Sequence, residues 1–314
     1  MMWKPRCNSI DGMLFSAHFS EEIVRSALSY EPRPGDIFLV SYPKCGTTWM
    51  QHILYGIFND GKAPSSYSEV SAKMPFLESQ GAEVVANLSA PRVIKTHLPF
   101  GKQPYSAKAK YVYITRNPYD CCVSYYYHIK HMPVYAFGDG AFDVFFDVFV
   151  QGRIGFGDYF DHLLPWYAHR DDPNVFFLTY EDLKENTALW IRKVADFLGS
   201  GYGDILRENP AVVESIVEAT TVANMKKLVN PYMKNIGEIF RSTPFDELPR
   251  WARLKLECGG ERMKEPMTGD FIRKGEVGDW KNHFSAEQVK RMKERIAFKT
   301  GGSDVMTLWS KLDL

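Results

Sequence analysis

The sequence predicts an α/β domain with a central, mostly parallel β-sheet flanked by helices. Three observations support this fold class. Short apolar runs fit buried strands, helical patterns lie between them, and the first run leads through a glycine-containing loop into an amphipathic helix. Strands that are buried on both faces of a parallel sheet tend to be continuously apolar, as these runs are.

Four runs are expected to form the sheet, and they cover residues 37–41, 92–97, 111–115 and 175–180. The first helix is expected over residues 47–58, where an apolar stripe with helical spacing is formed by Met50, Ile53, Leu54, Ile57 and Phe58. Thr47 or its neighbour is expected to cap this helix. A second helical pattern contains Trp190, Val194, Phe197 and Leu198.

The chain is expected to form one domain over residues 1–314, because it has neither a low-complexity linker nor an internal repeat. Within it we distinguish an N-terminal arm (1–33), a core that bears the motifs (34–284) and a C-terminal helix (285–314). The C-terminal third is rich in Gly, Lys and Arg, so we expect it to be largely irregular.

Composition excludes several classes of protein. Lys plus Arg and Asp plus Glu are equal at 38 each, which argues against a binder of nucleic acid or membrane surfaces. No apolar stretch approaches the roughly 20 residues of a membrane span, and no signal peptide follows Met1, so we expect a cytoplasmic protein. Five cysteines without a CxxC pair predict free thiols and no metal site.

The first motif is the loop of residues 42–49 between the first strand and the first helix, which resembles a P-loop in position. A glycine (Gly46), a cation (Lys44) and two hydroxyls (Thr47 and Thr48) at a helix N-terminus can hold a phosphate. It is not a Walker A loop, because the lysine precedes the glycine. A tight turn with a capping threonine is the alternative interpretation.

Two further motifs stand at strand ends, where parallel sheets bind ligands. Lys95 and His97 end one strand, and a histidine there can accept a proton from a hydroxyl group. Arg116 ends the next strand and can grip a phosphate with its planar guanidinium. A structural histidine and a surface Arg116–Asp120 pair are the alternatives.

A fourth motif occupies residues 273–281 and begins Arg273-Lys274-Gly275. Two adjacent cations before a glycine can surround an anion with side chains and backbone N–H groups. The alternative is a solvated charged loop.

Taken together and in this order, the four motifs resemble those of the cytosolic sulfotransferases. The segments YPKCGTTW, KTHLP, RNPYD and RKGEVGDWK match the family's patterns, and the resemblance extends from about residue 34 to about residue 284. It implies a transferase that uses 3′-phosphoadenosine 5′-phosphosulfate (PAPS), releases PAP and needs no metal.

The resemblance also implies a role for individual residues. The catalytic group is His97 as the base, with Lys44, Lys95 and Ser124. The 5′-phosphosulfate loop is Lys44, Cys45, Gly46, Thr47 and Thr48, followed by Trp49, which is expected to stack on the adenine. The 3′-phosphate group is Arg116, Ser124, Arg273, Lys274 and Gly275, and the adenine-side group is Tyr180, Thr220 and Thr221. Ser124 is also expected to hold Lys44 until the acceptor arrives.

Three departures from the family pattern lead to further expectations. Val222 stands where an aromatic residue is common, so adenine stacking is expected on one side only. Cys45 stands where serine is common and is expected to be oxidisable. The family's C-terminal dimer motif is not visible, which predicts a monomer or a non-standard dimer.

The acceptor is expected to be a small molecule with a hydroxyl group, a phenol or a phenolic monoamine. The residues expected to contact it are Phe15, Phe76, Lys95, His97, Phe142 and Asp143. Asp143 lies in an apolar run and has two interpretations, as a partner for a substrate ammonium group or as a cap of the following helix.

Two other functions remain open from the sequence. A nucleotide kinase would need a Walker A lysine and carboxylates for Mg²⁺. A catalytically silent PAP-binding protein would keep the phosphate motifs and lose the base.

Overall fold

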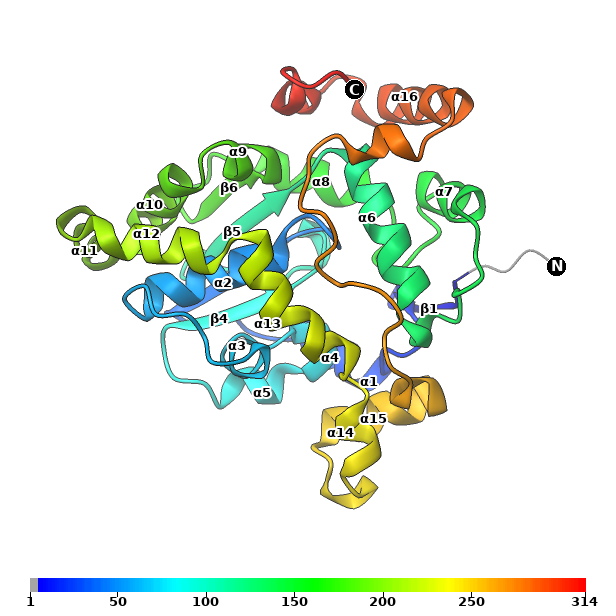
Figure 1. The fold of residues 1–314 in the computed structure, drawn as a ribbon, viewed down its shortest axis with the longest axis horizontal. Helices are drawn as coiled ribbons and strands as arrows, with labels where there is room; N and C mark the ends of the chain where they lie inside the picture. The colour runs from blue at the N-terminus through cyan, green and yellow to red at the C-terminus, as the bar shows by residue number, and fades with distance from the viewer. Residues whose placement is uncertain (1–4) are drawn as a thin grey trace.

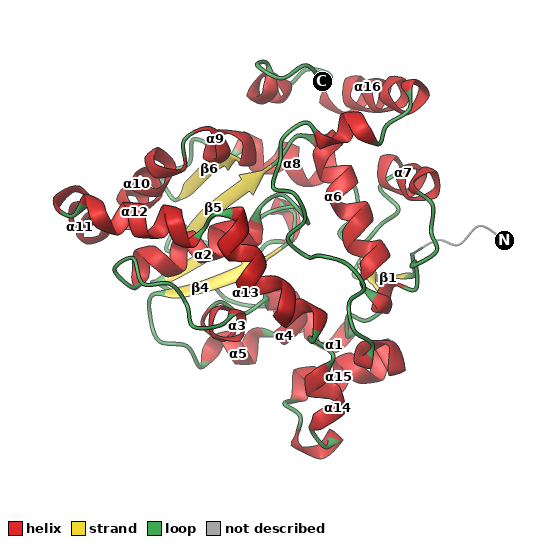
Figure 2. Ribbon diagram, in the orientation of Figure 1, coloured by secondary structure: helices red, strands yellow, loops and turns green. Residues whose placement is uncertain are grey.

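The central sheet is parallel and four-stranded. In the computed structural model, which describes residues 5–314, the strands lie in the order β4-β3-β5-β6 (Figure 2). Their bounds are Asp36–Val40 for β3, Arg92–Thr96 for β4, Lys110–Thr115 for β5 and Val175–Thr179 for β6. All four strands predicted from the sequence are therefore confirmed, with ends that differ by one residue.

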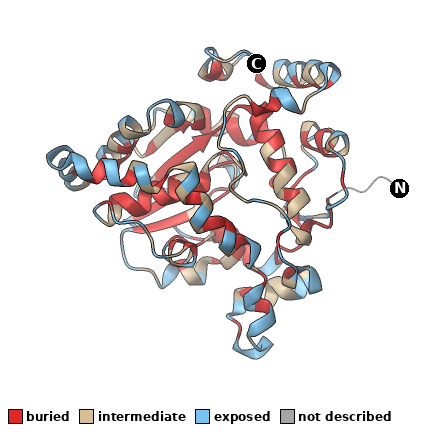
Figure 3. Ribbon diagram, viewed as in Figure 1, coloured by how far each residue is buried: buried red, intermediate tan, exposed pale blue. Residues whose placement is uncertain are grey.

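The sheet separates two hydrophobic cores. On β3, Ile37 and Leu39 belong to one core, whereas Phe38 and Val40 belong to the other. This alternation follows from the two-residue repeat of side-chain direction along a strand. Both cores bury apolar residues, which explains why the strands are continuously apolar (Figure 3).

The core that contains Ile37 and Leu39 is completed by one set of helices. These are α2 (Thr47–Phe58), α3 (Tyr67–Lys73), α9 (Tyr180–Glu185), α10 (Thr187–Leu198), α11 (Ser200–Glu208), α12 (Pro210–Ala219) and α13 (Val222–Lys234). The predicted helix at residues 47–58 is confirmed at both ends.

A second set of helices completes the core that contains Phe38 and Val40. These are α1 (Glu21–Leu28), α4 (Leu77–Gln80), α5 (Ala82–Ala86), α6 (Pro118–His131), α7 (Phe142–Val150), α8 (Tyr159–Ala168) and α16 (Ala286–Thr300). Among residues 5–314, no helix is long and apolar enough to cross a membrane.

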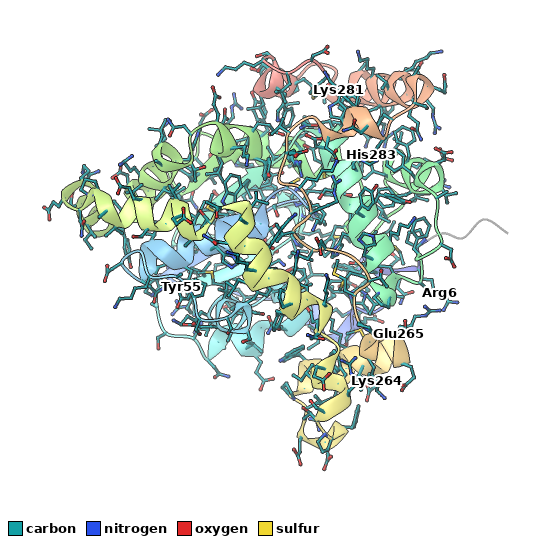
Figure 4. The ribbon with its side chains drawn as sticks, in the orientation of Figure 1. Arg6, Tyr55, Lys264, Glu265, Lys281 and His283 are labelled. Carbon is teal, nitrogen blue, oxygen red and sulfur yellow. The ribbon has the colours of Figure 1, made fainter. Side chains whose placement is uncertain are left out.

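The expectation of an irregular C-terminal third is wrong. It is largely helical. Two of its helices, α14 (Glu238–Ser242) and α15 (Arg250–Gly259), form a small hydrophobic cluster of their own around Phe240. The longest stretch of this third without helix or strand is residues 265–278. They leave α15 and cross the molecule to the start of α6, with Lys264 and Glu265 at one end and His283 just past the other (Figures 1 and 4).

The N-terminal arm contains an element that the sequence patterns did not predict. It forms an antiparallel hairpin of β1 (Cys7–Ile10) and β2 (Met13–Ser16), which packs its apolar residues into the core of α6 and α7.

Candidate active site

One large cavity, with a volume of about 1170 Å³, lies beyond the carboxyl ends of β3, β4 and β5. Most of the residues predicted from the sequence line it. These are Lys44, Gly46, Thr47, Thr48, Trp49, Phe76, Lys95, His97, Arg116, Ser124, Tyr180, Thr220, Thr221, Arg273, Lys274 and Gly275. Four predicted residues do not line it, namely Cys45, Phe15, Phe142 and Asp143.

The loop after β3 leaves the N-terminus of α2 without a side-chain cap. Gly46 stands at the cap position with φ of 107°, and a Cβ there would come within 3.0 Å of Ile114 and Tyr180. Of the expectation that Thr47 or its neighbour caps the helix, the neighbour Gly46 holds the position, whereas the Thr47 hydroxyl is bonded to Ser41 Oγ at 2.5 Å. The first N–H groups of α2 are therefore available to an anion in the cavity.

Lys44 adds a cation to this loop. Its Nζ lies 4.0 Å from the centre of the Phe271 ring. The hydrogen bond from Ser124 that the family resemblance implies stays a prediction. Burial, together with the positive charges of Lys95 and Arg116, lowers the pKa of Lys44 to about 7. A bound anion would restore the charge of this ammonium group.

Cys45 belongs to the core behind the loop. Its side chain is fully buried, and its Sγ lies 3.7 Å from Sγ of Cys121. Its backbone N–H donates a hydrogen bond to the Tyr42 carbonyl. The expectations that Cys45 contacts the cofactor and is readily oxidised are thus wrong, because neither the thiol nor the amide reaches the cavity.

Arg116 and Asp120 fasten the crossing segment to α6. Arg116 Nη2 donates to the Glu276 carbonyl at 2.7 Å, and Asp120 accepts from the N–H groups of Gly278 and Trp280. Nε of Arg116 is buried without a hydrogen-bond partner among the described residues. From the sequence, Asp120 was expected only as a surface partner of Arg116, whereas in the structure it is buried and anchors the fourth motif.

Residues 273–275 lie over the cavity from that segment. Arg273 Nη2 and Lys274 Nζ each lie 2.5 Å from a carboxylate oxygen of Asp279, which holds the pKa of that carboxyl well below its usual range. Gly275 has φ of +69°, and a Cβ there would lie 2.4 Å from Val222 Cγ2. Only glycine fits this close approach of the backbone.

The residues that the family resemblance assigns to the adenine line the cavity next to Arg116. The Tyr180 ring meets Trp49 edge-on at 5.3 Å and lies under the Arg116 guanidinium at 4.4 Å. Thr179 caps α9 and so fixes where Tyr180 points. Thr220 and Thr221 also line the cavity, although both hydroxyls bond to carbonyls of α12.

His97 is held as a neutral imidazole. Its Nδ1 lies 2.7 Å from the Ser41 carbonyl oxygen, which can only accept, so Nδ1 carries the proton and Nε2 carries the lone pair. Burial and the positive charge of Lys95 lower the pKa of His97 well below its usual value. A neutral imidazole with a free Nε2 can accept a proton from a hydroxyl group.

Glu78 supports His97 and was missed from the sequence. Its buried carboxylate accepts from the His97 backbone N–H at 2.6 Å and from the Thr96 hydroxyl at 3.0 Å. Burial raises the pKa of Glu78 to about 7.

Lys95 lies on β4, two residues before His97. Burial lowers its pKa to about 8, and its Nζ lies over the Phe76 ring.

The rest of the cavity is walled by aromatic rings. Phe76 and Phe156 lie 5.0 and 5.3 Å from the His97 ring. Phe15 was expected here, but it is fully buried and packs behind Phe19 and Phe156. The substrate-binding role predicted for Phe15 is corrected accordingly.

The predicted roles of Phe142 and Asp143 are also corrected. Phe142 packs on Tyr126 and Phe284, away from the cavity. Asp143 accepts a hydrogen bond from Gln288 Nε2 at 2.8 Å and so joins α7 to α16. It forms no cap hydrogen bond either, because Ala141 is the cap residue of α7. Sequence spacing alone could not reveal that this face of α7 is covered by α16.

Comparison with known proteins identifies the family. A family model described as the sulfotransferase domain matches residues 34–248, which is more than half of the chain. The chain belongs to the sulfotransferase family. Human Sulfotransferase 1C2 is 31% identical over 287 residues, covering 88% of this chain and 87% of the relative. Bovine Sulfotransferase 1E1 is 33% identical over 266 residues, covering 82% of this chain and 80% of the relative.

A third relative and a solved structure extend the comparison. Rabbit amine sulfotransferase is 33% identical over 275 residues, covering 86% of this chain and 82% of its own. The crystal structure of mouse sulfotransferase SULT7A1 complexed with PAP has a TM-score of 0.70 at 26% identity, covering 97% of this chain and 98% of that chain. The resemblance and the α/β fold class predicted from the sequence are confirmed.

Proposed function

We propose that this sulfotransferase moves the sulfuryl group of PAPS to the hydroxyl of a small phenolic acceptor. The observation that supports it most directly is the neutral His97, with its lone pair on Nε2, in the same cavity as the uncapped N-terminus of α2 and Lys44. The anion site and the base are neighbours, because Ser41 Oγ lies 3.3 Å from His97 Nδ1 and 2.5 Å from the hydroxyl of Thr47 at the start of α2.

The donor half of the cavity fits PAPS. Lys44 and the free N–H groups of α2 suit the 5′-phosphosulfate, and the unpartnered Nε of buried Arg116 suits the 3′-phosphate. Arg273 and Lys274 would exchange Asp279 for this same phosphate, and Gly275 lets the backbone approach closely. Trp49, Tyr180, Thr220 and Thr221 would contact the adenine, with Val222 on the side where the family often has an aromatic ring.

The residues divide the work of the transfer. PAPS supplies the activated sulfuryl group when bound. His97 Nε2 takes the proton of the acceptor hydroxyl as the new O–S bond forms. Lys44 stabilises negative charge that grows on the leaving phosphate, and Lys95 stabilises the transferring oxygens. Ser124 lines the cavity beside this group and completes the proposed catalytic set.

Two rival functions are less well supported. A nucleotide kinase needs a lysine after the glycine of its loop, whereas Lys44 precedes Gly46. Among residues 5–314, no cluster of three or more His, Cys, Asp or Glu side chains is placed to hold a metal ion. A silent PAP-binding protein would not require a base, and here His97 is oriented by two separate hydrogen-bonding groups, Ser41 and Glu78.

The rings of Phe19, Phe76 and Phe156 support a flat, aromatic acceptor. The preference for an ammonium group rested on Asp143, which lies outside the cavity. A phenol therefore remains the proposed acceptor, and amines belong in the test because of the rabbit relative's name.

The test is transfer of radiolabelled sulfate from PAPS to a panel of phenols, phenolic amines, hydroxysteroids and alkanols. We expect product with phenols, and its formation should be unaffected by EDTA. Transfer to none of these acceptors by a protein that binds PAP would favour the silent binding protein. Inhibition by EDTA that Mg²⁺ restores would favour the kinase.

A further inference from the structure

Lys255 places a cation in the acceptor half of the cavity, a position that no sequence motif indicated. It lies on α15, and its Nζ donates to Ser79 Oγ at 2.9 Å. In Figure 1, α15 lies with α14 in a cluster beside α1 and apart from the sheet. From this helix Lys255 and Trp251 line the cavity.

The charge of Lys255 lacks a counter-ion among the described residues. No carboxylate of the described residues forms an ion pair with its Nζ within 4 Å, and this includes the acidic side chains that line the cavity, Glu238, Glu265 and Glu276. Glu78 lines a smaller adjoining hollow together with Lys255 and Ser79, but its hydrogen bonds go to Thr96 and the His97 backbone. Burial and the nearby charge of Lys95 lower its pKa to about 8, so most of it is still charged at neutral pH. An anion bound between Lys255 and Lys95 would offset the cost of removing both charges from water.

An aromatic wall extends from His97 toward Lys255. His97 contacts Phe76, the Phe76 ring lies 5.9 Å from Phe19, and Phe19 lies 4.7 Å from His18. The positive charge of Lys255 acts on His18, whose pKa is held well below its usual value chiefly by burial. This part of the cavity thus combines the His97 imidazole, an aromatic wall and the Lys255 ammonium group.

We propose that the acceptor carries a carboxylate at the end opposite its hydroxyl, and that Lys255 binds this carboxylate. The inference rests on the proposed function and specifies its substrate class, a phenolic acid. The hydroxyl lies at His97, the ring and chain lie against Phe19 and Phe76, and the carboxylate replaces the missing counter-ion of Lys255. A cationic amine of the same shape would be repelled by Lys255 and Lys95.

The experiment compares 4-hydroxyphenyl alkanoic acids of increasing chain length with their methyl esters, which lack the charge, and with tyramine. The quantity measured is the ratio of kcat/KM for an acid to kcat/KM for its ester. In the wild type this ratio should exceed one for the acid whose chain length fits best. Lys255→Met should lower the ratio at least about tenfold, mainly through KM of the acid, whereas Lys255→Arg should keep most of it. Lys62→Met, which removes an exposed lysine outside the cavity, is the matched control.

The outcomes separate this inference from the proposed function. Calorimetry with PAP first establishes that each variant folds with an intact donor half. Transfer to esters and amines without a preference for any acid, or an unchanged ratio in Lys255→Met, would overturn the role of Lys255 while leaving the sulfotransferase activity in place. If Lys255→Met does not bind PAP, Lys255→Gln is used as the test variant in its place. The acid-to-ester ratio of the wild type alone also tests the inference, because a wild type without a preference for any acid would overturn it. Absence of transfer to any acceptor would overturn the proposed function instead.

Discussion

Binding of PAP should be coupled to protonation of Lys44. Burial and neighbouring cations lower the pKa of Lys44 to about 7 in the free protein. The phosphates of PAP beside this ammonium would raise its pKa again, so a neutral Lys44 must take up a proton when PAP binds. The coupling can be measured by calorimetry in two buffers that differ in ionisation enthalpy.

The size of the effect follows from the pKa. At pH 8 a group with a pKa of about 7 is roughly nine-tenths neutral, so binding should take up about 0.9 proton, against about 0.1 proton at pH 6. Because the charged form binds, the affinity for PAP should fall as pH rises, by up to about tenfold between pH 8 and pH 9.

Lys44→Met and Lys44→Arg are the matched controls. Neither side chain titrates near neutral pH, so both should lose this proton uptake, and only Lys44→Met should also bind PAP weakly at pH 6. The difference between wild type and these variants removes the contribution of the nucleotide's own phosphates. Equal proton uptake by wild type and Lys44→Arg at pH 8 would refute the assignment of the low pKa to Lys44.

Four other variants test the rest of the site. His97→Ala should lower kcat by about 10²- to 10⁴-fold with PAP affinity unchanged, and near-normal turnover would remove His97 from the mechanism. Arg273→Ala should weaken the binding of PAP by about 1.5–3 kcal/mol in calorimetry and leave the binding of adenosine 5′-phosphate unchanged. An equal loss of binding free energy for both nucleotides would contradict a 3′-phosphate role. Gly275→Ala should weaken PAP because its Cβ meets Val222, and unchanged affinity would argue against that close approach. Between pH 4.5 and pH 7 Glu78 stays protonated in the folded wild type but not in the unfolded chain, so the free energy of unfolding should fall by about 3 kcal/mol as pH rises through this range. Glu78→Gln should lack this fall. Urea unfolding that shows the same pH dependence in both proteins would contradict the raised pKa.

The sheet and the donor motifs could be predicted from the sequence because their signals are local. A continuous apolar run followed by Gly46 specifies a buried strand, a turn and a helix within about 20 residues. Strand ends gather at one edge of a parallel sheet, so Lys95 and Arg116 could be expected together without knowledge of the helices. The structure brings both to the same cavity.

The acceptor half could not be predicted because it depends on long-range packing. Asp143 looked like a lone carboxylate in an apolar run, but its partner Gln288 is 145 residues further along the chain. Lys255 has no unusual sequence context, and only the packing of α15 brings it to Ser79. Glu78 was visible as a charge, yet its hydrogen bond to the His97 backbone depends on how α4 meets β4.

The same electrostatics explain how a neutral base and charged lysines can coexist near neutral pH. Lys95 and burial keep His97 unprotonated, which a base requires. The same positive charge of Lys95 also helps burial to lower the pKa values of Lys44 and Lys255. An anion bound between these groups would raise the pKa of each lysine while the Ser41 carbonyl still fixes the His97 tautomer. Lys95, with a pKa of about 8, is already mostly charged at neutral pH, so Lys44, with a pKa of about 7, is the lysine whose charge should depend most on donor binding.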